Sequence, residues 1–341
     1  DKRAYQLAYF AVMMKARSYD RRFLTRKIEP NISVIEETNT IKKFSCDGVT
    51  NDREQNKVGE YLVNAYKHAK EIGSLIPIEN RDYNAFEEYL NTCNLSGQIT
   101  MDSDHWNRDT LPVMIKVVKQ ARIMIQKYSV VCTNPPYMNK LEGNLKKFVV
   151  EKYKPYSGDL FSVFIYKNFD YCKPNGYSAF MTPFVWMFIK TYENLREYII
   201  NQKSITALVQ MEYSAFEEAT VPICSFVLKN GQETEKGLYF KLSDFKGAIA
   251  DKNCVFFYET RAEKFSKIPG SPIAYWVQQG ILDAFAKGIV LDEISEIVTG
   301  MSTGDNNKYL RKWTEVNYDS LGLYQSDIDA VDLNKTYWIP Y

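Results

Sequence analysis

The sequence Asn-Pro-Pro-Tyr at residues 134–137 is the strongest chemical signal in this chain. It directly follows a short β-branched run at residues 128–133, which predicts a strand. Because prolines cannot continue a central strand, the chain must turn at this point. At ordinary residue frequencies, such a tetrapeptide is expected in roughly one of a thousand chains of this length. A proline turn that merely closes a strand is therefore the less favoured interpretation.

The four residues could bind a planar amine and make it more nucleophilic. The lone pair of the exocyclic amine of adenine is delocalised into the ring, and two acceptors aimed at the amine hydrogens would localise it. The side-chain oxygen of Asn134 and the carbonyl of Pro135 can be these acceptors, and the stiffness of Pro135 and Pro136 would preorganise them. Tyr137 offers a flat ring for stacking, worth about 1–3 kcal/mol per base. An adenine in duplex DNA would have to be flipped out to reach this site.

The elements that must position the tetrapeptide alternate between strands and helices. We expect helices at 159–172 and 184–202, and strands at 128–133, 177–182, 205–211, 222–228 and 237–242. This alternation predicts an α/β fold with a mostly parallel sheet. The last two strands, joined by a polar turn at Asn230-Gly231, suggest a hairpin with an antiparallel strand near one edge. Ligands of such sheets bind beyond the carboxyl ends of the strands, where the tetrapeptide lies.

Further segments surround this sheet. Apolar residues at helical spacing predict a helix at residues 3–19, and a short apolar run at 32–35 predicts a buried strand. Residues 53–127 are mostly helical and charged, which indicates a helical insertion. We expect one domain over residues 1–245 and a second segment over 246–341, where the strand–helix rhythm is lost.

Composition and targeting signals narrow the class of protein. The 43 Lys and Arg residues nearly balance the 42 Asp and Glu residues, so no overall charge attracts nucleic acid, although a local basic cleft remains compatible with this balance. No signal peptide and no apolar run of membrane-spanning length is visible, which indicates a cytoplasmic protein without a membrane partner. His68 and His105 lie in polar, helix-like surroundings, so we expect no metal site.

The cysteines do not predict a metal site either. None of them forms a Cys-x-x-Cys pair, and several lie in apolar runs. This pattern favours buried free thiols in a reducing compartment over disulfides. The six residues are Cys46, Cys93, Cys132, Cys172, Cys224 and Cys254.

Residues 131–137 resemble the fourth motif of the amino-methyltransferases that act on the N6 position of adenine. Residues 268–276 and 299–306 resemble the stretch that leads into the target-recognition region of one group of these enzymes. The chain is similar to the large methyltransferases of type IIG restriction systems, and above all to the adenine-specific DNA methyltransferases of BREX phage-defence systems. The resemblance implies a Rossmann-like class I methyltransferase sheet, with residues 246–341 as connector and start of the target-recognition region.

The same resemblance implies an activity and its partners. The activity is transfer of a methyl group from S-adenosylmethionine to adenine N6 in DNA, as part of phage defence or restriction-modification. The partners are double-stranded DNA with a flipped adenine and other proteins of a defence system.

The resemblance also assigns roles to single residues. Phe216 matches a later motif whose ring packs against the flipped base, and a core aromatic is the competing interpretation. Asp1, which follows the second motif, Glu36, which matches the third, and Asn134 would contact the cofactor; a salt-bridged or solvated Glu36 is an equal alternative. Asp159 opens the helix where the family has its fifth motif, although helix capping is the favoured role for it.

One departure from the family pattern concerns the cofactor. The family's first motif is a Gly-rich turn after the first strand, and no Gly-x-Gly occurs in this sequence. We therefore expect the sheet to be incomplete at its N-terminus and residues 1–245 to lack the first motif. A chain of this kind should bind S-adenosylmethionine poorly and be inactive by itself.

Two other functions remain open at this stage. Protein-glutamine methyltransferases also use Asn-Pro-Pro-Tyr, because a planar side-chain amide poses the same chemical problem as adenine; they are compact, however, and lack a long insertion. A non-catalytic DNA-binding or assembly module of a defence complex is the second alternative, with residues 53–127 as a partner surface. Methyl-transfer assays on DNA and on protein would separate these functions.

Overall fold

The computed structural model describes residues 2–44, 52–94, 106–211, 221–243, 257–289, 291–296 and 304–320 of the 341-residue chain. The chain divides into two compact units, Asp1–Ala286 and Lys287–Tyr341. In the second unit the described helices are α11 (Leu291–Ile294) and α12 (Asn306–Tyr309), together with two 3-10 turns. The sheet and the candidate site belong to the first unit. No described helix is both long and apolar enough to cross a membrane.

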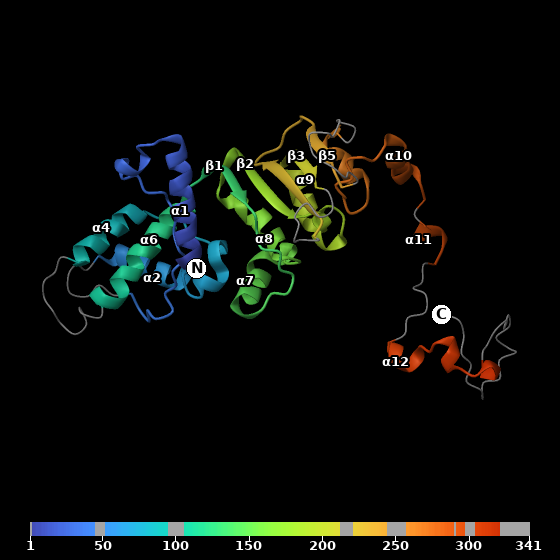
Figure 1. The fold of residues 1–341 in the computed structure, drawn as a ribbon, viewed down its shortest axis with the longest axis horizontal. Helices are drawn as coiled ribbons and strands as arrows, with labels where there is room; N and C mark the ends of the chain where they lie inside the picture. The colour runs from blue at the N-terminus through green and yellow to red at the C-terminus, as the bar shows by residue number, and fades with distance from the viewer. Residues whose placement is uncertain are drawn as a thin grey trace. The chain divides into compact units, whose positions relative to one another are not determined.

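A six-stranded sheet is formed by the described residues of the first unit (Figure 1). Its order is β1-β2-β4-β3-β5-β6, and its strands are β1 (Tyr128–Thr133), β2 (Cys172–Pro183), β3 (Ser204–Gln210), β4 (Ile223–Lys229), β5 (Gly237–Lys241) and β6 (Phe257–Thr260). Strands β1 and β2 pair in parallel, as do β3 and β5. Strand β4 is antiparallel to both β2 and β3, and β6 is antiparallel to β5. Four strands thus share one direction, which confirms the predicted α/β fold.

The predicted hairpin near residue 230 is wrong. Strands β4 and β5 are not neighbours, because β3 lies between them. The turn packs instead against the start of β2, where the amide of Asn230 donates to the carbonyl of Gly176 at 2.8 Å. Strand β4 is a nearly continuous apolar run, which is typical of an interior strand that is paired on both edges. A turn signal shows where the chain reverses, but it does not show which strand becomes the neighbour.

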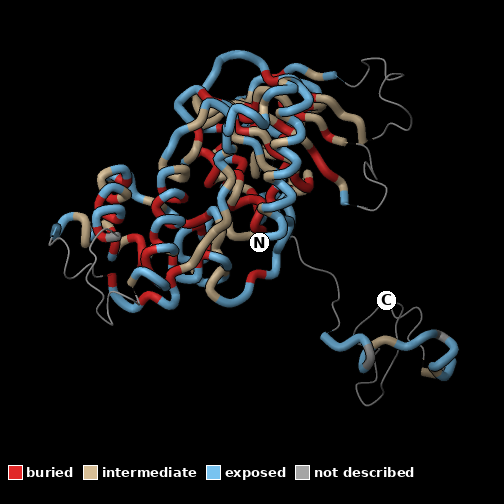
Figure 2. The backbone as a smooth tube through the Cα atoms, turned by 60° about the vertical axis from the view of Figure 1, so that its left-hand side comes forward, coloured by how far each residue is buried: buried red, intermediate tan, exposed pale blue. Residues whose placement is uncertain are grey.

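Helices α8 (Leu160–Lys167) and α9 (Glu193–Gln202) pack against this sheet (Figure 1). The buried stretches of backbone lie mainly in the interior of the first unit, and exposed stretches lie on its outside (Figure 2). Fully buried side chains of both helices and of the strands β2, β3 and β4 form the main core: Phe161, Ile165, Leu195, Ile199, Phe180, Leu208 and Phe226. The helix predicted at 184–202 is correct only from Glu193 onward. Residues 184–192 form two 3-10 turns instead, Phe184–Met187 and Lys190–Tyr192.

The described part of residues 53–127 is helical, as predicted. It contains α2 (Arg53–Ala65), α3 (Ala69–Ile72), α4 (Tyr83–Asn94) and α6 (Leu111–Ile125). These helices enclose a core of their own, with Leu62, Phe86, Leu90 and Val117 fully buried in it. A smaller cluster joins Leu75 of this region to α7 (Gly143–Tyr153) and α8. The helical region therefore has a hydrophobic core that is separate from the core of the sheet.

The predicted strand at residues 32–35 is wrong, whereas the predicted helix at 3–19 is confirmed as α1 (Lys2–Tyr19). Residues 32–35 have no strand neighbour in the described structure; the side-chain amide of Gln120 donates to the carbonyl of Val34 and accepts from the amide of Glu36. One amide side chain thus takes the place of a neighbouring strand. An apolar run cannot show whether a partner strand exists.

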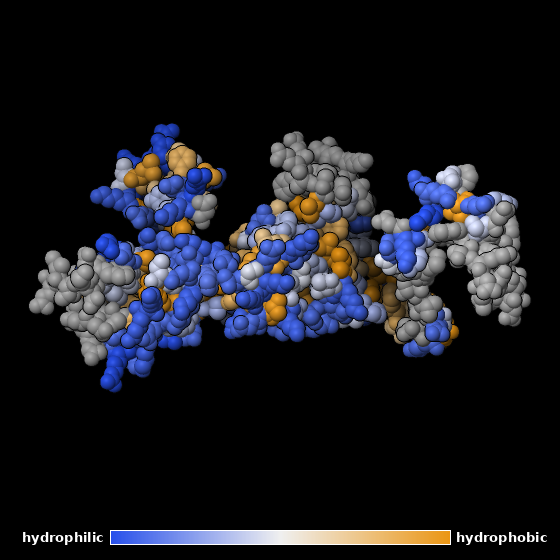
Figure 3. Space-filling model, turned by 90° about the horizontal axis from the view of Figure 1, so that it is seen from below, coloured by the Kyte–Doolittle hydropathy of each residue, from blue (hydrophilic) through white to orange (hydrophobic). Residues whose placement is uncertain are grey.

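Helix α1 buries none of its residues. Leu7 is 70% and Phe10 62% exposed. On the face of the molecule in Figure 3, hydrophobic residues lie in small patches among hydrophilic ones.

The cysteines follow the prediction only in part. Cys132, Cys172 and Cys224 are free thiols, and the last two are buried as expected. Cys93, however, is disulfide-bonded, so the prediction of free thiols is wrong for this residue. Disulfide pairing depends on which cysteines the tertiary fold brings together, and an apolar run around a cysteine carries no information about that.

Candidate active site

Strand β1 carries the tetrapeptide at residues 134–137 to the carboxyl end of the sheet. The last residue pair of β1 joins Thr133 to Phe180 of β2. Beyond it, Pro135 is buried and the other three residues of the tetrapeptide are exposed. Because prolines have no amide hydrogen, the ladder ends here and the chain turns, as predicted. The turn leaves the side chains of Asn134 and Tyr137 accessible from solvent.

Asp159 holds the segment after the tetrapeptide against the start of helix α8. Its carboxylate accepts hydrogen bonds from the amide of Met138 at 2.9 Å and from the amide of Phe161 at 3.2 Å. The amide of Leu160 returns a hydrogen bond to the carbonyl of Met138 at 3.0 Å. The favoured interpretation of Asp159 as a helix cap is confirmed, and the side chain is 7% exposed. Burial raises the pKa of Asp159, while the backbone amides that it accepts from oppose this shift.

The side chain of Tyr137 contacts both strand β2 and helix α8. Its hydroxyl oxygen is 3.1 Å from the side-chain oxygen of Asn134 and 3.1 Å from the carbonyl oxygen of Met181, near the end of β2. The ring contacts Phe161 edge to face, with ring centroids 6.3 Å apart, and stays 41% exposed. Burial of the hydroxyl, with a smaller contribution from Cys224, raises the pKa of Tyr137. The hydroxyl therefore remains a hydrogen-bond donor at neutral pH.

Phe216 lies outside the described residues, so its predicted contact with the target base stays a prediction. The described residues on either side of this segment lie at the same end of the sheet as Asn134. The amide of Met211 donates to the carbonyl of Ile223 at 3.0 Å, and the amide of Phe184 donates to the carbonyl of Pro222 at 3.2 Å. The position of these flanking residues is compatible with the proposed role of Phe216.

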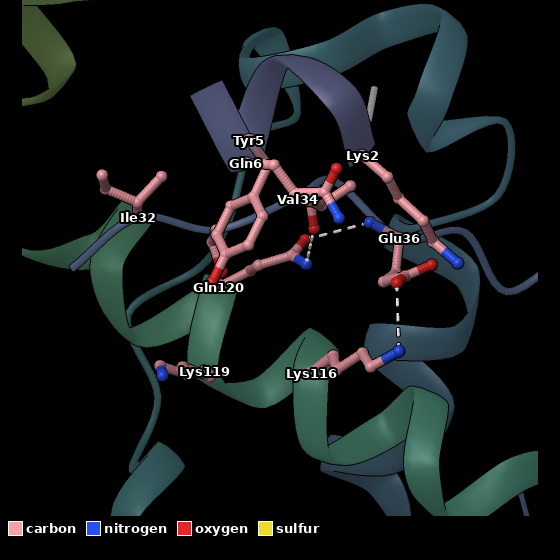
Figure 4. A pocket seen from close by; sticks show the side chains of 10 residues that line it. Lys2, Tyr5, Gln6, Ile32, Val34, Glu36, Lys116, Lys119 and Gln120 are labelled. Atoms are coloured by element: carbon pink, nitrogen blue, oxygen red, sulfur yellow. Dashed lines mark hydrogen bonds and ion pairs between the residues drawn. The ribbon is translucent and has the colours of Figure 1, made fainter. Parts of the chain in front are cut away.

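Glu36 lines a cavity of about 330 Å³ between the start of α1 and helix α6 (Figure 4). The carboxylate of Glu36 is 3.3 Å from the ammonium nitrogen of Lys116, and its side chain is 15% exposed. The cavity is lined by Lys2, Tyr5, Gln6, Ile32, Ser33, Val34, Glu36, Lys116, Lys119 and Gln120. Asp1 lies outside the described residues, but its neighbour Lys2 belongs to this lining. The structure thus brings the predicted third-motif residue next to the start of the chain.

Two of the predicted cofactor contacts, Glu36 and Asn134, already have protein partners in the described residues. The Glu36 carboxylate is already paired with Lys116, so hydroxyl groups of a cofactor would have to share it. In the described ranges no hydrogen bond or ion pair joins Glu36 to Asn134, whose partner is Tyr137. The cofactor roles predicted for Asp1, Glu36 and Asn134 therefore stay predictions. No group of three or more potential metal ligands occurs in the part of the chain that the structure describes.

Two contacts of the site could not be predicted from the sequence. Met181 takes part through its backbone carbonyl, which every residue has, so its side chain gives no hint of the contact. Phe161 supports the ring of Tyr137 from a helix 24 positions later, and a helix of this kind is expected to have apolar residues. The hydrogen bond from Met138 to Asp159 could have been inferred, because a carboxylate oxygen that caps a helix has a further lone pair to accept a second donor.

Comparison with known proteins relates the chain to restriction-modification methylases and to adenine-specific methyltransferases. A family model described as Eco57I restriction-modification methylase matches residues 1–216. The adenine-specific methyltransferase PglX of Lacticaseibacillus casei (strain Zhang) is 31% identical over 364 residues, which cover 100% of this chain and 30% of that protein. The adenine-specific methyltransferase BrxX of Escherichia coli O9:H4 (strain HS) is 28% identical over 375 residues, with the same coverage of both proteins.

Among solved structures, the methyltransferase subunit of a type I restriction-modification system from Streptococcus thermophilus is similar to 48% of this chain. The match covers 32% of that subunit, with 17% sequence identity and a TM-score of 0.30. The chain spans 30% of the length of the two adenine-specific methyltransferases that it matches over its whole length.

Proposed function

This chain belongs to the Eco57I restriction-modification methylase family, and we propose its function from that premise. It forms part of an enzyme that transfers a methyl group from S-adenosylmethionine to the N6 amine of adenine in DNA. Both relatives that match the whole chain are named adenine-specific methyltransferases. The enzyme acts in phage defence or restriction-modification, with double-stranded DNA and other defence proteins as partners. Residues 1–245 contribute to catalysis, and residues 246–341 lead into target recognition.

The observation that supports this proposal is the placement of the tetrapeptide at the carboxyl end of the sheet. Asn134 has its side-chain amide at this end of the sheet, with the oxygen 3.1 Å from the Tyr137 hydroxyl, and Pro135 has a carbonyl oxygen to which no described group donates a hydrogen bond. Both oxygens can accept hydrogen bonds from the two N6 hydrogens of an adenine. Amine hydrogens held in this way localise the lone pair on N6, which raises its nucleophilicity.

Tyr137 contributes the surface on which the base rests. Its ring is exposed enough to be reached, and Phe161 supports it from one edge. Stacking of this kind tolerates any planar base, so Asn134 and Pro135 must select the amine. Phe216 would cover the other face of the base. When bound, S-adenosylmethionine supplies a methyl group on a positively charged sulfur; the residues named here position the amine for in-line attack on that carbon.

Replacing Asn134 with Ala in the complete protein, including any residues that flank this chain, tests the proposal. We expect kcat for transfer of labelled methyl groups to DNA to fall about 100-fold or more, because one of two preorganised acceptors is lost. Asn139→Ala, at an exposed position five residues further on, is the matched control and should leave kcat unchanged. Unchanged DNA methylation in Asn134→Ala would contradict the catalytic role and favour an assembly module. Methylation of protein but not of DNA by the unmodified enzyme would favour a glutamine methyltransferase.

A further inference from the structure

The hydroxyl of Tyr137 has one proton to donate, and two acceptor oxygens lie within hydrogen-bond distance of it. Its oxygen is 3.1 Å from the side-chain oxygen of Asn134 and 3.1 Å from the carbonyl oxygen of Met181. A tyrosine hydroxyl donates a single hydrogen bond and can accept others. When the proton points to one of these oxygens, the other faces a lone pair of the hydroxyl. The hydroxyl can therefore donate to only one of these two oxygens at a time.

A half-turn of the Asn134 amide removes this conflict. The oxygen and nitrogen ends of an amide have nearly the same size, so the turn needs no movement of Tyr137 or Met181. The amide nitrogen of Asn134 then donates to the Tyr137 hydroxyl, and the hydroxyl donates to the Met181 carbonyl. All three groups are paired, and the oxygen of Asn134 faces away from Tyr137 with both lone pairs available.

We infer that the Tyr137 hydroxyl is a positioning group that selects which end of the Asn134 amide faces the substrate amine. The inference rests on the proposed function, because only an amine substrate requires the oxygen end. If the nitrogen end of Asn134 faced N6, two donors would meet and the amine could not bind productively. The hydroxyl thus acts through Asn134, in addition to any stacking by the ring of Tyr137.

The hydroxyl and one of its two partners, the Met181 carbonyl, are held firmly, which suits a positioning role. Met181 lies within β2 and is paired with Ser225 of β4, so its carbonyl is fixed by the sheet. The ring of Tyr137 rests against Phe161, which follows the cap residue Asp159 at the start of α8. The hydroxyl is therefore positioned by the sheet and by a helix, while Asn134 is free to turn about its own side-chain bonds.

Tyr137→Phe in the complete protein removes the hydroxyl and keeps the ring. We expect kcat for DNA methylation to fall about fivefold to tenfold, the factor that one hydrogen bond of ordinary net strength accounts for. The KM values for DNA and S-adenosylmethionine should stay within about twofold, because stacking is retained. Base flipping, followed by the fluorescence of 2-aminopurine at the target position, should not change, since that base has no 6-amine. An unchanged kcat would overturn the inference.

The effect of Tyr137→Phe should also be measured in a variant that already has Asn134→Asp. A carboxylate presents an oxygen at both ends, so no group is needed to choose between them. Single-turnover transfer in the Asn134→Asp variant should therefore change less than about twofold when Tyr137→Phe is added. An equal fall in both backgrounds would show that the hydroxyl acts independently of Asn134, and loss of all transfer in Asn134→Asp would equally contradict the inference. Failure of the proposed function differs from these outcomes, because the unmodified enzyme would then not methylate DNA.

Discussion

At the scale of the residue, Asp159 shows how one side chain can join two segments of a site. It caps helix α8 and, through the amide of Met138, holds the segment that immediately follows the tetrapeptide. Both oxygen-to-amide contacts use the same carboxylate oxygen, and the side chain is 7% exposed. A neutral amide oxygen could accept the same two hydrogen bonds without the cost of burying a charge.

Substitutions at Asp159 should separate the hydrogen bonds from the charge. We expect Asp159→Ala to lower the free energy of unfolding by about 1–2 kcal/mol, because a helix cap and a loop contact are lost. Asp159→Asn keeps an acceptor oxygen and should change that free energy by less than about 0.5 kcal/mol at neutral pH. Urea denaturation of both variants measures these values. Equal losses in the two variants would show that the charge itself is needed.

The pH dependence of these variants has a defined sign. Burial raises the pKa of Asp159 in the folded protein above its unfolded value of about 3.9. The folded state therefore retains a proton that the unfolded state has lost, and the stability due to this group falls as pH rises from the unfolded pKa through the folded pKa. Above this window, Asp159→Asn should gain stability relative to the unmodified protein. Denaturation midpoints measured from pH 4 upward (roughly the start of the window) test this; a relative loss would contradict it.

At the scale of the element, Arg196 of helix α9 fixes the turns that follow β2. It is 1% exposed. Its guanidinium donates to the carbonyls of Trp186 at 2.8 Å, of Ile189 at 2.7 Å and of Gly270 at 2.7 Å and 3.0 Å. Burial lowers the pKa of Arg196, and Glu193 and Glu197 oppose this shift. The guanidinium thus joins the 3-10 turns that follow β2 to Gly270. Gly270 lies in the segment 268–276, whose sequence resembles the stretch that leads into a target-recognition region.

We therefore expect Arg196→Met to be strongly destabilising, although the methionine side chain is apolar and similar in length to that of arginine. Three carbonyls, one in a buried and two in part-buried contacts, would lose their donors, and we expect the free energy of unfolding to fall by about 3 kcal/mol. Lys190→Met, an exposed change on the neighbouring 3-10 turn, is the control and should stay within about 0.5 kcal/mol. Chemical denaturation followed by circular dichroism measures both. A loss below about 1 kcal/mol in Arg196→Met would mean that water replaces the guanidinium.

At the scale of the whole molecule, we expect this chain to hold only a small part of a cofactor site. The sequence has no Gly-x-Gly turn, and the Glu36 carboxylate is engaged by Lys116. Strand β1 has β2 as its neighbour in the described sheet, and Val130 in it is 63% exposed. Exposed strand edges of this kind are usually covered in complete proteins. That the sheet is incomplete at its N-terminus stays a prediction.

We expect the 341-residue chain by itself to bind S-adenosylmethionine with a Kd weaker than about 1 mM, corresponding to less than about 4 kcal/mol. The reason is that only one side of the cofactor would meet residues suited to it. Isothermal titration calorimetry of the chain, with the complete protein as control, measures this. Micromolar binding by the chain would show that the cofactor can be held without a Gly-rich turn.

Several features of this protein follow from the sequence alone. The α/β alternation, the strand that ends at Thr133, the turn at the prolines and the capping role of Asp159 were all predicted correctly. Each of them depends on neighbours in the chain: the β-branched run, the missing amide hydrogens of proline, and a side-chain oxygen placed before a helix. The roles of Asn134 and Tyr137 were inferred from the same local pattern, and they await the experiments above.

The tertiary structure alone decided which segments become neighbours. Strand β3 inserts between β4 and β5, Gln120 takes the place of a partner strand for residues 32–35, and Cys93 is disulfide-bonded. It also placed the Met181 carbonyl beside the Tyr137 hydroxyl, 44 positions away in the chain. Backbone groups are the same in every residue, and contacts between distant segments are chosen by packing of the entire core. Local sequence therefore determines where elements begin and end, whereas only the folded chain determines what each of them touches.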